Sequence, residues 1–414
     1  MPHKGSEIKE LSSLFRKLAL LFICTILLLF YWWYKKTAYE IDTKRKLFSN
    51  SEETVLSGRE VAKEAFKFLA SLHAAERIVE GKRCAESAPC IAVESSNPIA
   101  AIAWSMLGNA KLYSAEKNQK YIENIRKLYS SLVLGPSALY LYQINLTQLM
   151  EGFKASRDLV LLQVIMDKIQ TLRMQIDGDN GVNILSQGEM VASLVAGEFA
   201  DFYEFSGDPL VIDFLKSSWL PQEYSEENFE KYRASFLIAA KKILGQLERL
   251  QTLKEAEAKP RSATSQDFSC FIQLAKSKYF LVTQDPAYLE QLSSYFDNAD
   301  FKSKASEDLP FNVLQPALAC AETLKNILGK KPEHMENFRS IIENYVLPRF
   351  DYSGRPLCNG DNGFLGSMSA GLSCNGATKF VSDTAWVISI LADTDIQFKI
   401  SKKRITRRLE KTKI

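Results

Sequence analysis

The sequence predicts an all-α protein in which an array of helical hairpins follows one N-terminal transmembrane helix. Three observations support this fold class. Apolar residues recur at helical spacing in thirteen segments of the chain. Alternating apolar and polar runs, which would indicate strands, are nearly absent. In addition, one short junction sequence recurs between the helices, which is typical of repeated helical hairpins.

Residues 18–34 form an uncharged run of 17 residues with two basic residues on each side. At about 1.5 Å of rise per residue this run covers roughly 26 Å, close to the thickness of a hydrocarbon core. It ends in four aromatic residues, which favour the headgroup level, and no small-residue cleavage site follows. We therefore expect a short tail at 1–17, an uncleaved anchor in membrane lipid at 18–34 and a juxtamembrane linker at 35–53.

The cysteines indicate on which side of the membrane the main domain lies, because the basic residues flanking the anchor are nearly balanced. Six of the seven cysteines lie outside the anchor. Cys84 with Cys90, and Cys358 with Cys374, are close in sequence, and we expect both pairs to form disulfides, as in oxidising compartments. We predict a single-pass membrane protein with a cytoplasmic N-terminus and an extracytoplasmic domain, periplasmic or at the cell surface. Six reduced thiols in a cytosolic domain are the alternative.

Metals, nucleotides and nucleic acids are not expected ligands. Neither cysteine pair has zinc-site spacing and the chain has only three histidines, so we expect no metal. Phosphate-loop and dinucleotide fingerprints are absent from the sequence, so we expect no cofactor. The basic C-terminal tail at 399–414 carries eight Lys or Arg and one Glu, whereas the main segment is acidic. This argues against nucleic acid as a partner and favours contact of the tail with anionic lipid, a solvated helix end being the alternative.

The predicted main domain spans residues 54–398 and consists of helices separated by Pro- and Gly-containing turns. The expected helices cover residues 54–79, 99–114, 118–134, 137–153, 157–175, 187–205, 208–218, 226–256, 266–283, 286–297, 312–328, 333–347 and 379–393.

The junctions FSGDPLVI and VTQDPAYL share an Asp-Pro step at which the aspartate caps a helix and the proline occupies its first position. Looser copies bring the equivalent positions to Asn118, Asp158, Asp208, Asp285 and Lys331, with spacings of 40, 50, 77 and 46 residues. A unit of about 40–50 residues indicates stacked helical hairpins, either open or closed into an (α/α) toroid. The interval of 77 leaves room for one degenerate junction.

Two further features resemble a known superfamily. Two loops contain the sequence GDNG, 182 residues apart. The segment SQGEMVASLVAGEFADFYEFSGDPLVIDFLKSSW resembles the inner-helix, turn, outer-helix unit of the six-hairpin (α/α) toroids. DNGFLGS and SDTAWVISIL resemble the last loop and the last inner helix of that group. The group contains glycoside hydrolases, polysaccharide lyases and uronyl epimerases, so the resemblance implies a closed toroid of about six hairpins.

The resemblance also implies a substrate groove at the mouth formed by the loops that enter the inner helices, where both GDNG loops would lie. Cleavage of a glycosidic bond requires a carboxylic acid and a second carboxylate. We expect Asp361 and Glu189 to form this catalytic pair, with Asp179 as a substitute. The residues expected to bind substrate are Asp383, Trp386, Asn362 and Phe364.

Each candidate has a structural alternative. Glu189 follows a serine at the spacing of a capping box, and Asp383 lies in the first turn of a predicted helix, where an acid favours the helix dipole. Asp361 lies in an Asp-Asn-Gly turn. Trp386 is equally suited to core packing.

The sequence therefore predicts a membrane-anchored extracytoplasmic protein that acts on a polysaccharide by hydrolysis, elimination or epimerisation at the GDNG loops. The alternative is a non-catalytic helical-repeat scaffold that binds a protein or a glycan in an envelope complex. An enzyme requires ionisable side chains that converge on one cleft, whereas a scaffold requires only a wide surface.

Overall fold

The computed structural model describes residues 53–73, 79–85, 88–94, 98–133, 145–178, 182–219, 225–257, 269–298, 314–353, 358, 360–366 and 378–401. Contacts divide the chain into two compact units, Met1–Thr54 and Val55–Ile414, and the description below concerns the second unit. The predicted tail and anchor, nearly all of the linker, and residues 402–414 of the basic tail lie outside the described residues. Within the described ranges, no helix is both long enough and apolar enough to cross a membrane.

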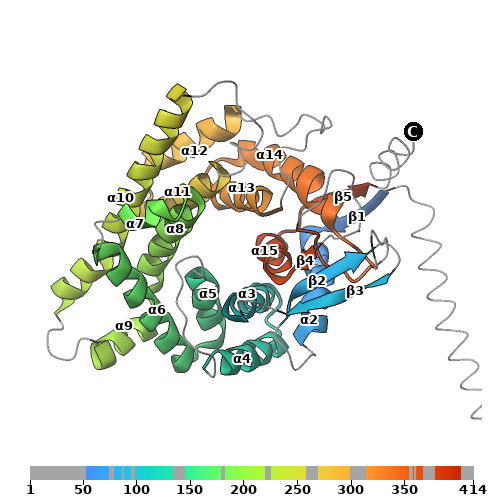
Figure 1. Cartoon of the computed structure of the whole chain (residues 1–414), viewed down its shortest axis with the longest axis horizontal. Helices are drawn as coiled ribbons and strands as arrows, with labels where there is room; N and C mark the ends of the chain where they lie inside the picture. Colours follow the sequence, from blue (N-terminus) through green and yellow to red (C-terminus); the bar gives the residue numbers. More distant parts are fainter. Residues whose placement is uncertain are drawn as a thin grey trace, which may run out of the picture. The chain divides into compact units, whose positions relative to one another are not determined.

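Six helices form a closed inner ring. Each packs against the next along the chain, and the last returns to pack against the first (Figure 1). The prediction of a closed (α/α) toroid is therefore confirmed. The inner helices are α3 (Pro98–Glu116), α5 (Leu146–Ser156), α8 (Glu189–Phe205), α11 (Ser269–Thr283), α13 (Leu314–Ile327) and α15 (Val381–Leu391).

Each inner helix is covered by an outer helix, and the core lies between these two layers (Figure 1). In the order of their inner partners, the outer helices are α4 (Gln119–Val133), α6 (Leu159–Gly178), α10 (Glu226–Glu257), α12 (Pro286–Asn298), α14 (Met335–Ile341) and α2 (Gly58–His73). The sixth hairpin thus combines the first outer helix with the last inner helix, so the two ends of the domain close the ring together.

Shorter helical segments connect these pairs. Two are the α-helices α7 (Val182–Ser186) and α9 (Pro209–Phe214). The others are the π-helices Leu215–Trp219 and Ile342–Val346 and the 3-10 helices Pro332–His334 and Leu347–Arg349. The described part of the 77-residue interval between two predicted junctions contains α9, the π-helix Leu215–Trp219, the long α10 and α11. The described part of this interval contains no additional hairpin, which corrects the expectation of a degenerate junction there.

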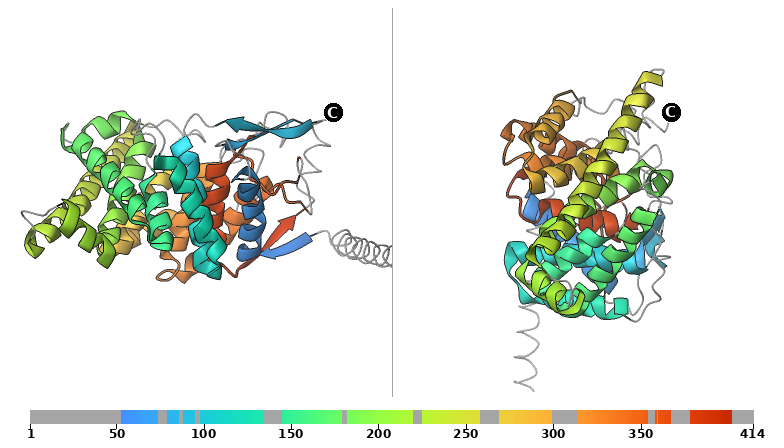
Figure 2. Two further views of the ribbon diagram at one scale, coloured as in Figure 1. Left: turned by 90° about the horizontal axis from the view of Figure 1, so that it is seen from below. Right: turned by 90° about the vertical axis from the view of Figure 1, so that its left-hand side faces the viewer.

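Five short strands correct the prediction of a purely helical protein. β1 (Glu53–Ser57) pairs with β5 (Gln397–Ser401), and β2 (Val79–Ala85) lies between β3 (Ala88–Glu94) and β4 (Thr378–Phe380) in an antiparallel sheet. Figure 2 shows the two sheets on opposite faces of the helical ring. This is expected because β4 directly precedes α15 and β5 follows it. Strands of three to seven residues are too short for a clear alternating pattern, and the sequence therefore did not reveal them.

The recurring junctions cap the outer helices as predicted. Asp208 Oδ1 accepts a hydrogen bond from the amide of Leu210 at 3.0 Å, and Asp285 Oδ1 accepts one from Ala287 at 3.0 Å. The side chains of Asn118 and Asp158 accept the equivalent bonds, whereas Lys331 makes no side-chain cap. Three of the junctions also share a residue with positive φ directly before the cap, namely Lys117, Arg157 and Gln284.

Disulfides tie two parts of the toroid together. Cys84 and Cys90 are bonded within the β2–β3 hairpin, so this predicted pair is confirmed. A second bond, which the sequence did not predict, joins Cys270 of α11 to Cys320 of the neighbouring inner helix α13. Cys358 is also disulfide-bonded. Its predicted partner, Cys374, lies outside the described residues, so that pairing stays a prediction.

Candidate functional site

A cavity of about 290 Å³ lies within the inner ring, and all six inner helices contribute to its lining. We call it the axial cavity. Its acidic lining residues are Glu151, Glu198, Asp201, Glu204, Glu322 and Asp393. Its lysines are Lys111, Lys154, Lys278 and Lys325, and its aromatic residues are Trp104, Phe271 and Trp386. This volume is near the lower limit of small-molecule sites, and the mixture of aromatic and ionisable groups is typical of them.

Glu198 is the most perturbed carboxyl group of the cavity. It lies in the middle of α8 with 4% of its surface exposed, and Oε1 accepts a hydrogen bond from the amide of Leu146 at 2.9 Å. Oε2 is buried without a hydrogen-bond partner. Burial raises the pKa of Glu198 to about 8, although nearby Lys278 opposes this shift. The carboxyl group is therefore protonated at neutral pH.

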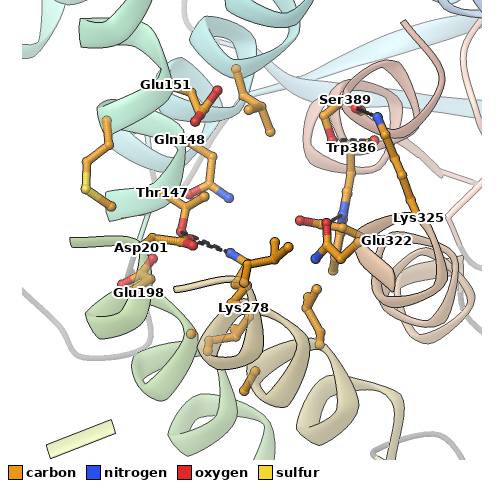
Figure 3. A pocket seen from close by; sticks show the side chains of 18 of the residues that line it. Thr147, Gln148, Glu151, Glu198, Asp201, Lys278, Glu322, Lys325, Trp386 and Ser389 are labelled. Carbon is orange, nitrogen blue, oxygen red and sulfur yellow. Dashed lines mark hydrogen bonds and ion pairs between the residues drawn. The ribbon is translucent and has the colours of Figure 1, made fainter. Parts of the chain in front are cut away.

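Asp201 lies one helical turn beyond Glu198 and, unlike Glu198, is paired with a cation. Its Oδ2 accepts a hydrogen bond from Thr147 Oγ1 at 2.6 Å and pairs with Lys278 Nζ at 2.6 Å. Burial alone would lower the pKa of Lys278, but Asp201 and the other surrounding carboxylates raise it overall. Lys278 therefore remains a cation, and its ammonium group lies against the carboxyl group of Asp201 (Figure 3).

The sequence of α8 explains how these groups reach the cavity. Glu198 and Asp201 are three residues apart, and side chains at that spacing lie on one face of a helix. Between the apolar residues that fix α8 in the ring, Gly197 leaves room for the neighbouring helix. A Cβ atom at this position would lie 3.1 Å from Lys278 Cδ, so a larger residue would displace the lysine that holds Asp201.

Three aromatic side chains that line the cavity lie close together, and Figure 3 shows one of them, Trp386, across the cavity from Glu198 and Asp201. The rings of Trp104 and Trp386 lie 5.4 Å apart, and Phe271 lies 6.3 Å from Trp386. Trp386 Nε1 donates a hydrogen bond to Glu322 Oε2, which fixes the indole of α15 against α13. Such rings offer apolar faces on which a sugar can stack.

Trp386 is thus the one predicted site residue that lines the axial cavity. Asp383 belongs to the same helix, α15, but is only 1% exposed and accepts a hydrogen bond from Gln315 Nε2 at 3.1 Å. Burial raises the pKa of Asp383 to about 6. Asp383 does not line the axial cavity, and its predicted role in binding substrate stays a prediction.

The second GDNG loop is held by a buried ion-pair cluster. Lys379 Nζ pairs with both Asp351 and Asp361, and Asp361 Oδ2 lies 3.6 Å from Lys82 Nζ. None of the residues that line the axial cavity comes from the described part of this loop. The carboxylate of Asp361 therefore binds the loop to the β2–β4 sheet, and its predicted catalytic role stays a prediction.

The two neighbours of Asp361 in this loop are also engaged in the fold. Asn362 is 5% exposed, and its Oδ1 accepts a hydrogen bond from the amide of Ser353 at 2.6 Å. Phe364 is fully buried and stacks on Phe350 with ring centroids 4.7 Å apart. Neither residue lines the axial cavity, and their predicted role in substrate binding stays a prediction.

The structure does not decide the roles of the two remaining predicted residues, Glu189 and Asp179. Glu189 is half-buried at the first position of α8, where Gly188 occupies the N-cap position with a φ of 107°. Its catalytic role stays a prediction. Asp179 lies outside the described residues. Within the described ranges, no cluster of three or more His, Cys, Asp or Glu side chains could hold a metal ion.

The ionisable residues of α8 were missed because acids at helical spacing usually mark a solvated helix face. A signal was nevertheless present. Glu198 and Asp201 lie in the segment VASLVAGEFADF, which is otherwise almost entirely apolar. An acid within such a segment has to be buried, and a buried acid with a perturbed pKa is a candidate for a functional site.

No family model and no curated protein matches the chain. Among solved structures, it is similar to the crystal structure of unsaturated glucuronyl hydrolase from Streptococcus agalactiae, with 11% sequence identity and a TM-score of 0.47. The match covers 85% of this chain and 96% of that chain. A likeness of this degree does not establish an activity or a substrate, and the toroid follows from the helix packing of the chain itself.

Proposed function

We propose that the chain is a carbohydrate-acting enzyme of the glycoside hydrolase type, with its active site in the axial cavity. The observation that carries this proposal is the pair Glu198 and Asp201. One is a buried carboxyl group whose pKa is raised to about 8, and the other is a carboxylate paired with a lysine. A buried carboxylic acid next to a carboxyl group paired with a lysine is the arrangement that acid–base cleavage of a glycosidic bond requires.

In the proposed reaction, Glu198 donates its proton to the glycosidic oxygen as the bond to the anomeric carbon breaks. A water molecule attacks that carbon, and Asp201 accepts a proton from the water. Lys278 and Thr147 hold the carboxyl group of Asp201 in place. Trp386 and Trp104 supply the stacking surface, with Trp386 fixed by its hydrogen bond to Glu322.

Hydrolysis is the form of the reaction that we propose, because Glu198 retains a proton at neutral pH and the leaving glycosidic oxygen requires one. The axial cavity also replaces the GDNG loops as the proposed site, because the described part of the second loop is committed to ion pairs and core packing.

A non-catalytic scaffold that binds a glycan or an envelope protein is the second candidate. One observation favours it: Glu198 Oε1 accepts a hydrogen bond at the first residue of α5 and thus also serves the fold. A scaffold would retain saccharide binding without turnover, so the two proposals separate in one assay.

Turnover by the Glu198→Gln variant tests the proposed enzyme. Glutamine keeps the hydrogen bond to the Leu146 amide but has no proton to donate, so kcat should fall about 10²–10⁴-fold with little change in KM. The assay would use the purified full-length chain, a panel of aryl glycosides and oligosaccharides, and detection of released reducing ends. Glu227→Gln on the exposed face of α10 is the matched control and should retain full activity.

Two results would contradict the proposed mechanism. Equal kcat values for wild type and Glu198→Gln would remove Glu198 from the reaction. Saccharide binding by the wild type, without turnover of any member of the panel, would favour the scaffold.

We also propose that the domain is extracytoplasmic and tethered by the predicted anchor at 18–34, with the basic tail at 399–414 in contact with anionic lipid. The disulfides Cys84–Cys90 and Cys270–Cys320 support this location, because such bonds persist in oxidising compartments. An envelope polysaccharide or an envelope protein would then be within reach.

Thiol labelling of intact cells tests the proposed location. Cys90 is half-buried whereas Cys320 is fully buried, so a membrane-impermeant maleimide should label the Cys84–Cys90 pair in preference after external reduction. We expect labelling only after reduction, and a weaker signal in the Cys84→Ser/Cys90→Ser variant. Labelling that requires cell lysis and no reductant would place the domain in the cytoplasm.

A further inference from the structure

Every lysine that lines the axial cavity is already paired with an acid. Lys325 is additionally bound by the backbone oxygens of Ser389 at 3.0 Å and Ile390 at 2.8 Å, which fixes its amino group at the end of α15. The four ion pairs are Lys111–Glu151 at 2.6 Å, Lys154–Glu151 at 3.1 Å, Lys278–Asp201 at 2.6 Å and Lys325–Asp393 at 2.6 Å. The cavity therefore has no cation left for an anionic ligand among its described residues.

Three acids of the cavity, in contrast, have no ion pair within the described part of the chain: Glu198, Glu204 and Glu322. Glu322 uses Oε2 to accept the hydrogen bond from Trp386 Nε1, which leaves Oε1 for another donor. Glu198 is 4% exposed, lines the cavity, and its Oε2 has no hydrogen-bond partner. Polar groups without a partner among the described residues thus occur on both sides of the cavity: the protonated carboxyl group of Glu198 on α8 and Oε1 of Glu322 on α13.

This distribution of charge discriminates between classes of saccharide. A uronic acid would bring a carboxylate into a confined space where it meets other carboxylates and no free cation, which is unfavourable. A protonated amine would meet Glu322 and Glu204 with its N–H donors, and charge-assisted hydrogen bonds are stronger than neutral ones. The adjacent indole of Trp386 favours a cation as well as a sugar face.

We propose that the axial cavity selects a saccharide carrying a protonated amino group, of the glucosamine type, and disfavours uronic acids. The proposal rests on the proposed function, in which the same cavity holds a saccharide for cleavage. Glu322 is assigned as the residue that determines specificity by binding the ammonium group, and Glu204 as a second acceptor.

Calorimetric titration of the full-length chain at pH 6 with three trisaccharides tests this inference. The probes are the trimers of glucosamine, N-acetylglucosamine and galacturonic acid. The glucosamine trimer should bind about tenfold more tightly than its acetylated counterpart, because acetylation removes a charge-assisted hydrogen bond, and the galacturonate trimer should bind most weakly. The preference for the amine should decrease at high salt.

The Glu322→Gln variant separates the charge from the shape of the site. Glutamine still offers an oxygen to Trp386 Nε1, so the indole stays in place. The variant should lose the preference for the amine, about tenfold, while it binds the acetylated trimer as the wild type does. Glu227→Gln on the surface of α10 serves as the control and should leave all three affinities unchanged.

The outcomes distinguish this inference from the proposed function. Turnover of a neutral or uronate saccharide that depends on Glu198, without preference for the amine, would overturn the inference and leave the proposed function standing. Equal binding of the glucosamine and acetylated trimers, or an unchanged preference in Glu322→Gln, would also overturn the inference. An absence of both binding and turnover for every saccharide tested would overturn both.

Discussion

Replacing Lys379 with methionine is expected to lower the free energy of unfolding by about 3–5 kcal/mol. The side chains of Lys379 and Asp351 are both fully buried, and Lys379 also pairs with Asp361. Asp351 accepts hydrogen bonds from the amides of Cys358 and Gly360, so it orders the loop as well as the lysine. Without the lysine, the fully buried Asp351 would lose an ion-pair partner within the core, which is strongly unfavourable.

Urea denaturation of the full-length chain under non-reducing conditions, followed by far-UV circular dichroism, measures this effect. Asp361→Asn is the matched control, because Asp361 is 15% exposed and its loss leaves the Lys379–Asp351 pair intact. Its effect should be clearly smaller. The Asp351→Asn/Lys379→Met double variant should recover part of the lost stability. A cost below about 1 kcal/mol for Lys379→Met would show that the cluster is not a stabilising element.

The stability of the protein is expected to fall as the pH rises from about 5 to 8. Glu198 has a pKa of about 8 in the folded protein, well above the ordinary value of 4.5 that applies after unfolding. Within this interval the folded state holds a proton that the unfolded state has released, so raising the pH favours unfolding. At about 1.4 kcal/mol per pKa unit, the loss amounts to roughly 3–5 kcal/mol.

The Glu198→Gln variant isolates this contribution. Glutamine resembles the protonated acid and cannot ionise, so the variant should match the wild type near pH 4.5 and become the more stable protein near pH 8. The groups that act on Glu198 are Lys278, Asp201, Lys168 and the Leu146 amide, and all of them are retained. Asp383, whose pKa is raised to about 6, also contributes pH dependence, but equally in both proteins. Parallel stability profiles in urea melts across this range would contradict the assignment.

Much of the helical layer could be predicted from the sequence because its signals are local. The helical spacing of apolar residues predicted helices at 187–205 and 226–256. In the structure these helices are Glu189–Phe205 and Glu226–Glu257. The Asp-Pro junctions predicted helix starts through a cap and a fixed proline angle, both properties of neighbouring residues. The closed ring followed from the repeat and from the resemblance to six-hairpin toroids.

The site could not be predicted in the same way because it is formed by residues from all six inner helices. Whether Asp201 is paired depends on Lys278, 77 positions away, and on the rotation of two helices about their axes. The GDNG loops were selected because of their turn sequences. In the structure, however, Asp361 of the second loop pairs with the buried Lys379 and thereby holds the loop in the fold. Among the described candidates, only Trp386 lines the axial cavity, because an aromatic residue on an inner helix is favourable for either stacking or packing.

The pairing of α2 with α15 has a consequence for the order in which the protein can assemble. The apolar face of α2, which includes Val61, Phe68 and Leu69, is among the first parts of the domain to be synthesised, whereas α15 is among the last. At a synthesis rate of about 5–20 residues per second, α15 is synthesised roughly 15–60 s after α2. A nascent chain therefore exposes the apolar face of α2 until α15 has been synthesised. A chain truncated before α15 would leave the apolar face of α2 exposed, and we expect chaperones or proteases to bind it.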